Sequence, residues 1–131
     1  MEHIFEQFTL DYFGKGKHKT TFAAFLEQEG AVLIDVRSKE EAQTLPIKFA
    51  CHDNISAMNI PISEVPKRLT DIPKDKPVGL FCPATIRSSM VYALLLSKGY
   101  ENVRILEGGY PALTESVMPF RVLQAVKASE L

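Results

Sequence analysis

The stretch that decides the fold is Val78-Gly79-Leu80-Phe81-Cys82-Pro83-Ala84-Thr85-Ile86-Arg87-Ser88. Its apolar run ends in Cys82, four residues lie between Cys82 and Arg87, and a helix-forming sequence follows. A strand that leads a thiol into a tight loop before a helix N-terminus favours the thiolate, because the loop N–H groups and the helix dipole both stabilise negative charge. For this stretch alone, an inert thiol at a buried strand end is the alternative.

Apolar runs and helical patterns alternate on both sides of this stretch. Besides the run at 78–81, short strands are expected at 31–34, 57–61 and 103–106. Helices are expected at 22–28, 39–43, 88–98, 111–115 and 122–128, with a short helical stretch at 63–69. This alternation predicts an α/β domain with a mainly parallel central sheet flanked by helices.

Capping residues mark several of the expected helix starts. Thr20 or Thr21 can cap the first helix, and Ser38 with Glu41 forms a capping box for the second. Ser88 or Ser89 is expected to cap the helix after the cysteine loop. The active sites of such sheets lie at the carboxyl ends of the strands, where both the cysteine loop and the Asp35-Val36-Arg37 turn fall.

Composition narrows the functional classes. The chain has 131 residues, 15 of them basic and 16 acidic, and two cysteines. This length fits one domain with its own core, and the near-neutral charge gives no basis for binding nucleic acid or an anionic membrane. The chain has no membrane-spanning apolar stretch, signal peptide, metal-ligand cluster or cofactor motif, so we expect a soluble cytoplasmic protein with mostly reduced thiols.

The first 17 residues differ in character from the rest. Residues 1–17 are rich in aromatic side chains and end in Gly14-Lys15-Gly16-Lys17. We expect an extension that packs its aromatic rings on the domain, with a partner-binding arm as the alternative. Residues 18–131 are then expected to form a single domain.

Four motifs in this order resemble the single-domain rhodaneses. They are Leu33-Ile34-Asp35-Val36-Arg37-Ser38-Lys39-Glu40-Glu41, Ala57-Met58-Asn59-Ile60-Pro61, the loop from Cys82 to Arg87, and Leu106-Glu107-Gly108-Gly109. The resemblance implies a three-layer rhodanese-like fold and an enzyme that transfers a sulfane sulfur through a persulfide on Cys82. The donor would be thiosulfate or a polysulfide, and the acceptor would be cyanide, a thiol or a sulfur-relay protein such as a thioredoxin-like protein.

The resemblance also assigns roles within the loop. Pro83, Ala84, Thr85, Ile86, Arg87 and Ser88 are expected to cradle the transferred sulfur. Cysteine phosphatases carry five residues between cysteine and arginine, so the four residues here disfavour a phosphatase or an arsenate-reductase-like enzyme. Arg87 either attracts an anionic donor or pairs with Glu40 or Glu41, and we favour the pairing.

Other candidate residues support this loop. Asp35 and Arg37 are expected to form a charged scaffold behind it, because a buried carboxylate needs a partner. Cys51 is expected to be a thiol in a surface or half-buried loop, with a second thiol that resolves the persulfide as the sharper alternative. No partner is evident for the neighbouring His52.

Several positions depart from the family pattern. Thr85 stands where related loops have glycine, and Pro83 removes one amide donor from the cradle. The sequence from 51 to 56 replaces a usual His-Pro-Gly pattern, and Leu113 stands near a usual tryptophan. These departures keep a second function open, a non-catalytic rhodanese-like binding or regulatory module.

Overall fold

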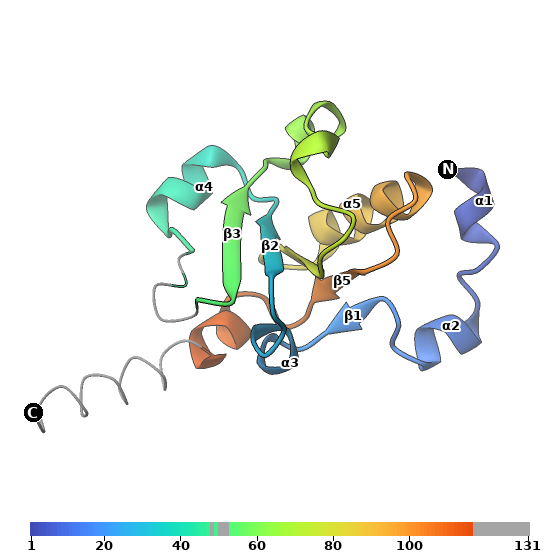
Figure 1. Cartoon of the computed structure of the whole chain (residues 1–131), viewed down its shortest axis with the longest axis horizontal. Coiled ribbons are helices and arrows are strands. Elements are labelled where there is room, and N and C mark those ends of the chain that lie inside the picture. The colour runs from blue at the N-terminus through green and yellow to red at the C-terminus, as the bar shows by residue number, and fades with distance from the viewer. Residues whose placement is uncertain (48, 50–52, 117–131) are drawn as a thin grey trace, which may run out of the picture.

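The computed structural model describes residues 1–47, 49 and 53–116. Within them, one sheet contains five strands: β1 Lys19–Thr20, β2 Ala31–Asp35, β3 Ile55–Asn59, β4 Val78–Phe81 and β5 Val103–Leu106. The strand order is β1-β5-β4-β2-β3, and all neighbouring strands are parallel. The strand that leads to Cys82 therefore lies in the middle of the sheet (Figure 1).

Helices cover both faces of this sheet. They are α1 Glu2–Phe5, α2 Leu10–Gly14, α3 Phe22–Leu26, α4 Lys39–Thr44, α5 Ile86–Ser97 and the 3₁₀ helices η1 Ile62–Lys67 and η2 Leu69–Asp71. Residues 109–116 are also helical. The prediction of an α/β domain with a mainly parallel sheet is confirmed.

Alternation along the strands divides the apolar residues into two cores, since successive side chains point to opposite faces of a sheet. On one face, Ile34 and Leu80 pack with Val91 and Leu95 of α5. On the other face, Leu33 and Phe81 pack with the α3 side chains and with Leu113. The sheet is thus the middle of three layers.

Three elements differ from the sequence-based expectation. β3 spans Ile55–Asn59 instead of 57–61, because its pairing with β2 starts at Ile55 and Pro61 has no N–H for a ladder. α5 begins at Ile86, before the serines expected to cap it. β1 was not predicted, because two residues are too short for a periodic pattern.

The residues before β1 form an arm with two short helices, α1 and α2. Ile4 of α1 is buried, Thr9 caps α2, and the rings of Phe8 and Tyr92 stack with centroids 6.4 Å apart. The hydroxyl groups of Tyr12 and Tyr92 are hydrogen-bonded. Phe8 and Tyr12 of the arm therefore both contact Tyr92 of α5.

None of the helices in the described part of the chain has both the length and the hydrophobicity that crossing a membrane requires. The expected helix at 122–128 and the residues Cys51 and His52 lie outside the described residues.

Candidate active site

Cys82 follows the last residue of the central strand and faces the start of α5. Its side chain is buried, with 1% of the residue exposed, and it forms no disulfide with any described residue. The backbone N–H of Ser88, in the first turn of α5, donates a hydrogen bond to Cys82 Sγ over 3.3 Å. The sulfur therefore lies at the positive end of a 12-residue helix, where negative charge is stabilised.

Ser88 also carries a buried side-chain hydroxyl. The residue is fully buried, and its Oγ has no hydrogen-bond partner among the described residues. Buried hydroxyl groups are normally paired, so the Ser88 hydroxyl is an unusual free hydrogen-bonding group in the first turn of α5. The expectation that Ser88 caps α5 is wrong, because Ser88 lies inside the helix and Thr85 is the N-cap residue.

Thr85 has the most unusual backbone in the loop. Its φ of 63° and ψ of −9° place it in the left-handed region, and no other described residue except glycine has a positive φ. A threonine thus occupies a backbone conformation that glycine adopts without strain. The Thr85 carbonyl accepts hydrogen bonds from the N–H and the hydroxyl of Ser89, which close the loop onto the helix.

Arg87 forms an ion pair with Glu41 of α4. Its Nη1 and Nη2 atoms donate to the two Glu41 carboxylate oxygens at 2.6 and 3.1 Å. Glu41 also completes the predicted capping box with Ser38. These bonds, led by that of Arg87, lower the pKa of Glu41 to about 2.

The expected pairing of Arg87 with a nearby glutamate is thus observed. Burial opposes a rise in the pKa of Arg87, but the hydrogen bond to Glu41 is the larger effect, so this pKa is raised. The electrostatic interaction of Arg87 with Cys82 acts in the same direction. Arg87 is therefore close enough to Cys82 for electrostatic interaction while its hydrogen bonds hold it to α4.

Asp35 and Arg37 form a fully buried ion pair behind the loop. Arg37 Nε and Nη2 donate to the two Asp35 oxygens at 2.8 and 2.7 Å. The remaining guanidinium donors reach the carbonyls of Glu41 and Leu45 and the hydroxyl of Tyr110. Burial, the largest single effect, would lower the pKa of Arg37, but the hydrogen bonds to Asp35 and Tyr110 and the charge of Asp35 together outweigh it, so this pKa is raised.

Gly109 provides the surface against which the cysteine loop rests. Its φ is +58°, and a Cβ at this position would overlap the carbonyl oxygen of Pro83. The next residue, Tyr110, contacts Arg37 through its hydroxyl and its ring, the latter 5.6 Å from Arg37 Cζ. The double-glycine motif thus positions the loop from the β5 side.

The structure brings most of the predicted site residues together. The loop from Cys82 to Ser88, the Asp35–Arg37 pair and Glu41 meet at the carboxyl edge of β2 and β4. Leu113 lies in the core instead, and Cys51 falls outside the described residues.

Two supporting residues had no assigned role in the sequence. Asn59 Nδ2 donates to the carbonyls of Asp35 and Arg37, and Tyr110 accepts from Arg37. The sequence offered one indication of a role for each residue: Asn59 lies at the carboxyl end of β3, and Tyr110 follows the double glycine. The contacts themselves depend on the tertiary fold.

Comparisons with known proteins agree with this geometry. The family model described as a rhodanese-like domain matches residues 18–116. A sulfurtransferase of Allochromatium vinosum is 30% identical over 93 residues, which cover 71% of this chain and 80% of that protein. A tRNA sulfurtransferase of Shewanella halifaxensis is 31% identical over 74 residues, which cover 56% of this chain but only 15% of that longer protein.

Solved structures give the same result. The human single-domain sulfurtransferase TSTD1 aligns with a TM-score of 0.56 at 27% identity, covering 74% of this chain and 95% of the human protein.

Proposed function

Because the chain belongs to the rhodanese-like domain family, we propose that it is a sulfurtransferase that carries a sulfane sulfur as a persulfide on Cys82. The observation that supports this most directly is the bond from the Ser88 N–H to Cys82 Sγ at the N-terminus of α5. A sulfur nucleophile needs such a donor and a positive electrostatic environment. An inert core thiol needs neither.

The reaction would take two displacement steps at sulfur. The Cys82 thiolate attacks the outer sulfur of thiosulfate, the donor S–S bond breaks, and sulfite leaves with the electron pair. An acceptor thiolate or cyanide then attacks the outer sulfur of the persulfide, and Cys82 leaves as the thiolate. The products are an acceptor persulfide or thiocyanate, and the protein returns to its starting state.

The surrounding groups would hold the charge on the outer sulfur. The loop N–H groups after Pro83 and the unpaired Ser88 hydroxyl are the available donors. Arg87 adds positive charge beside the site while Glu41 keeps it from filling the loop. The Asp35–Arg37 pair would act as a rigid support without touching the sulfur.

The short loop favours small sulfur donors. With four residues between Cys82 and Arg87, thiosulfate or a polysulfide fits better than a phosphate ester, so we propose these donors and a thiol acceptor. A reducing compartment such as the cytoplasm would supply such acceptors, including the exposed cysteine of a sulfur-relay protein.

Mass spectrometry of the loaded protein tests this proposal. After incubation with thiosulfate or a polysulfide, the peptide containing Cys82 is expected to gain about 32 Da, one sulfur atom, and to lose it on addition of cyanide or a thiol. Cys82→Ser should fold normally and abolish both the gain and the transfer.

The opposite results would contradict the proposal. Full transfer activity in Cys82→Ser would show that another group carries the sulfur. No mass increase with any donor would indicate the non-catalytic binding module. Steady hydrolysis of a phosphate ester by the wild-type chain, lost in Cys82→Ser, would point instead to a phosphatase.

A further inference from the structure

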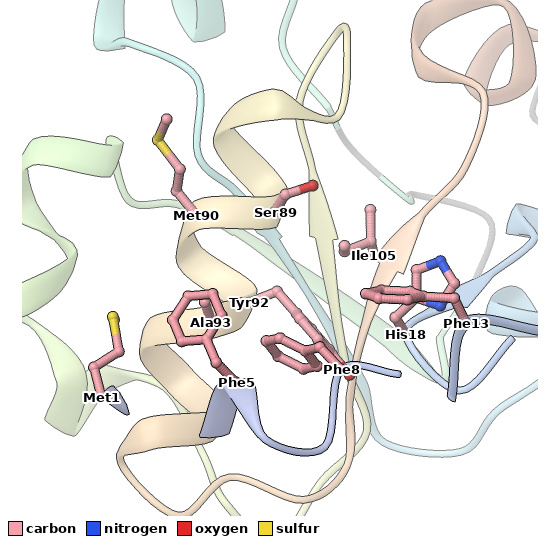
Figure 2. A pocket seen from close by; sticks show the side chains of 10 residues that line it. All are labelled: Met1, Phe5, Phe8, Phe13, His18, Ser89, Met90, Tyr92, Ala93 and Ile105. Carbon is pink, nitrogen blue, oxygen red and sulfur yellow. The ribbon is translucent and has the colours of Figure 1, made fainter. Parts of the chain in front are cut away.

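An apolar pocket of about 490 Å³ lies between the N-terminal arm and α5 (Figure 2). Phe5, Phe8 and Phe13 of the arm form one wall, and Met90 and Ala93 of α5 form part of the other. The Phe8 ring stacks on Tyr92 of α5, and Figure 2 shows Phe5 and Ala93 among the other side chains that line the pocket. Its volume and its aromatic lining are typical of small-molecule sites, which measure about 300–1,000 Å³.

The described lining of this pocket carries no charged side chain. His18 is the one basic side chain in this lining, and burial followed by the charge of Lys19 lowers its pKa, which favours the uncharged ring; the other basic group at the pocket is the N-terminal amine of Met1. The Ser89 hydroxyl already donates to the Thr85 carbonyl. A ligand that complements these walls is therefore uncharged and apolar where it contacts them.

Several lining side chains remain exposed although they are large and apolar. Phe5 is 58% exposed, Phe13 46% and Met90 60%. Isolated exposed apolar residues are common, but a concave group of them indicates a binding surface. Methionine suits this use, because its flexible side chain adapts to different apolar shapes.

A stripe of apolar residues on α5 runs from the pocket toward the cysteine loop. Ile86, Met90 and Ala93 are spaced i, i+4 and i+7, so they share one face of α5, and Ile86 is 64% exposed within the loop itself. At 1.5 Å per residue, this stripe is about 10 Å long. Ser89 joins the two regions, since it lines the pocket and bonds the loop at Thr85.

We propose that this pocket binds the hydrocarbon part of a small neutral thiol whose sulfur accepts the outer sulfur from Cys82. The inference rests on the proposed sulfurtransferase function and adds the acceptor class. The acceptor thiolate attacks the outer sulfur, its new S–S bond forms as the persulfide bond to Cys82 breaks, and Cys82 leaves as the thiolate. The apolar tail lies along Ile86 and Met90 and ends at Ala93.

A series of straight-chain thiols tests the pocket. Protein carrying the Cys82 persulfide is mixed with ethanethiol, butanethiol or hexanethiol, and the second-order rate constant of sulfur transfer is measured. The reacting group is the same throughout, so chain length changes mainly the binding. The rate constant is expected to rise about twofold or more per added methylene, below the about fourfold that complete burial would give.

Substitutions in the pocket should remove this dependence. Ala93→Phe fills the space and Met90→Ser removes an exposed wall, so both should reduce the hexanethiol-to-ethanethiol ratio at least about fivefold while leaving transfer to cyanide unchanged. Ala23→Phe, at an exposed position on α3, places the same ring on the opposite side of the sheet and should keep the wild-type ratio.

Failure of this inference is distinguishable from failure of the proposed function. Equal rate constants for all thiols, with cyanide still accepted, would overturn the acceptor class and leave the sulfurtransferase intact. If Cys82 cannot be loaded at all, the proposed function fails and with it the acceptor assignment. Binding of 1-hexanol to the Cys82→Ser protein, followed by NMR, then decides the pocket alone: saturable shifts at Phe5 and Ala93 support it, and none overturns it.

Discussion

Thr85 shows how a single residue strains the loop that the rest of the domain supports. A threonine with φ of 63° holds its β-branched side chain where only glycine is unstrained. Such conformations cost about 1–3 kcal/mol and persist only where neighbours enforce them. Here the two bonds from Ser89 to the Thr85 carbonyl provide that enforcement.

Thr85→Gly should therefore stabilise the protein. We expect the free energy of unfolding to rise by about 1 kcal/mol, because relief of strain exceeds the added chain entropy of glycine. Urea denaturation followed by circular dichroism measures the change. Thr70→Gly, at an exposed site without a positive φ, should destabilise, and a loss of stability in Thr85→Gly would contradict the strain.

Glu41 joins two structural tasks in one carboxylate. It caps α4 with Ser38 and fixes Arg87 beside the cysteine loop. Its pKa falls from 4.5 to about 2 on folding, first because of the hydrogen bond from Arg87. A group with a lowered pKa stabilises the fold above its unfolded value, and this stabilisation disappears as the pH falls through the folded value.

Glu41→Gln should therefore lower stability in a pH-dependent way. At pH 7 we expect a loss of about 1 kcal/mol, the scale of a half-exposed ion pair, and the difference from wild type should shrink between about pH 5 and pH 2. Urea denaturation across this range measures it, with the exposed Glu40→Gln as the control. A difference that stays constant with pH would exclude the ionic contribution.

At the scale of elements, the strands with continuous apolar sequences could be predicted, whereas the start of a helix without a side-chain cap could not. The buried runs of β2, β4 and β5 and the capping box of α4 were predicted within about a residue, because burial on both faces and local capping leave clear marks. The start of α5 was misplaced because Thr85 caps through its backbone, without a side-chain bond.

The residues of the candidate site were likewise predictable where a local sequence motif marks them. Cys82, its loop, and the pairing of Arg87 with a nearby glutamate could be predicted, because the motif order and the residue types carry that information. Contacts between distant segments, such as Arg37 with Tyr110, come from the packing of three strand ends and leave no local pattern.

Gly109 positions one element against another, and its substitution is expected to have a large effect on both stability and sulfur transfer. Gly109→Ala would force a methyl group into the Pro83 carbonyl and move the cysteine loop, so stability should fall by about 1–3 kcal/mol and sulfur transfer at least about tenfold. Denaturation and the transfer assay measure the two effects. This prediction fails if Gly109→Ala keeps normal transfer.

A second positive-φ glycine provides the control for that experiment. Gly99 has a φ of +88° and follows the C-terminal end of α5, far along the helix from the cysteine loop. A Cβ at this position would meet only the Lys74 Nζ atom, at 3.5 Å. Gly99→Ala therefore carries the backbone cost without displacing the loop. It should lose stability but keep transfer within about twofold of wild type.

At the scale of the molecule, the arm meets the rest of the domain mainly at α5. The family match begins at residue 18, just before β1, and no residue of the arm contributes a strand. The arm adds apolar contacts to the outer side of α5, where Ile4 is 3% exposed and Phe8 packs on the core. The strand pairs of the sheet begin at Lys19, and the hydrogen bonds described above for the cysteine loop include no residue of the arm.

Deleting residues 2–14 should therefore weaken the protein without abolishing its fold. The buried Ile4 contributes about 1.5–3 kcal/mol and the partly buried Phe8 contributes less, so we expect a loss of about 3 kcal/mol and one cooperative urea transition. Tyr12→Phe, which removes only the hydroxyl bonded to Tyr92, should cost about 1 kcal/mol. Transfer to cyanide should stay within about twofold, because the deletion leaves Cys82, Ser88 and the Glu41 pair in place. An unfolded truncated chain would show instead that the arm is part of the folding unit, and unchanged stability would show that its contacts are not formed in solution.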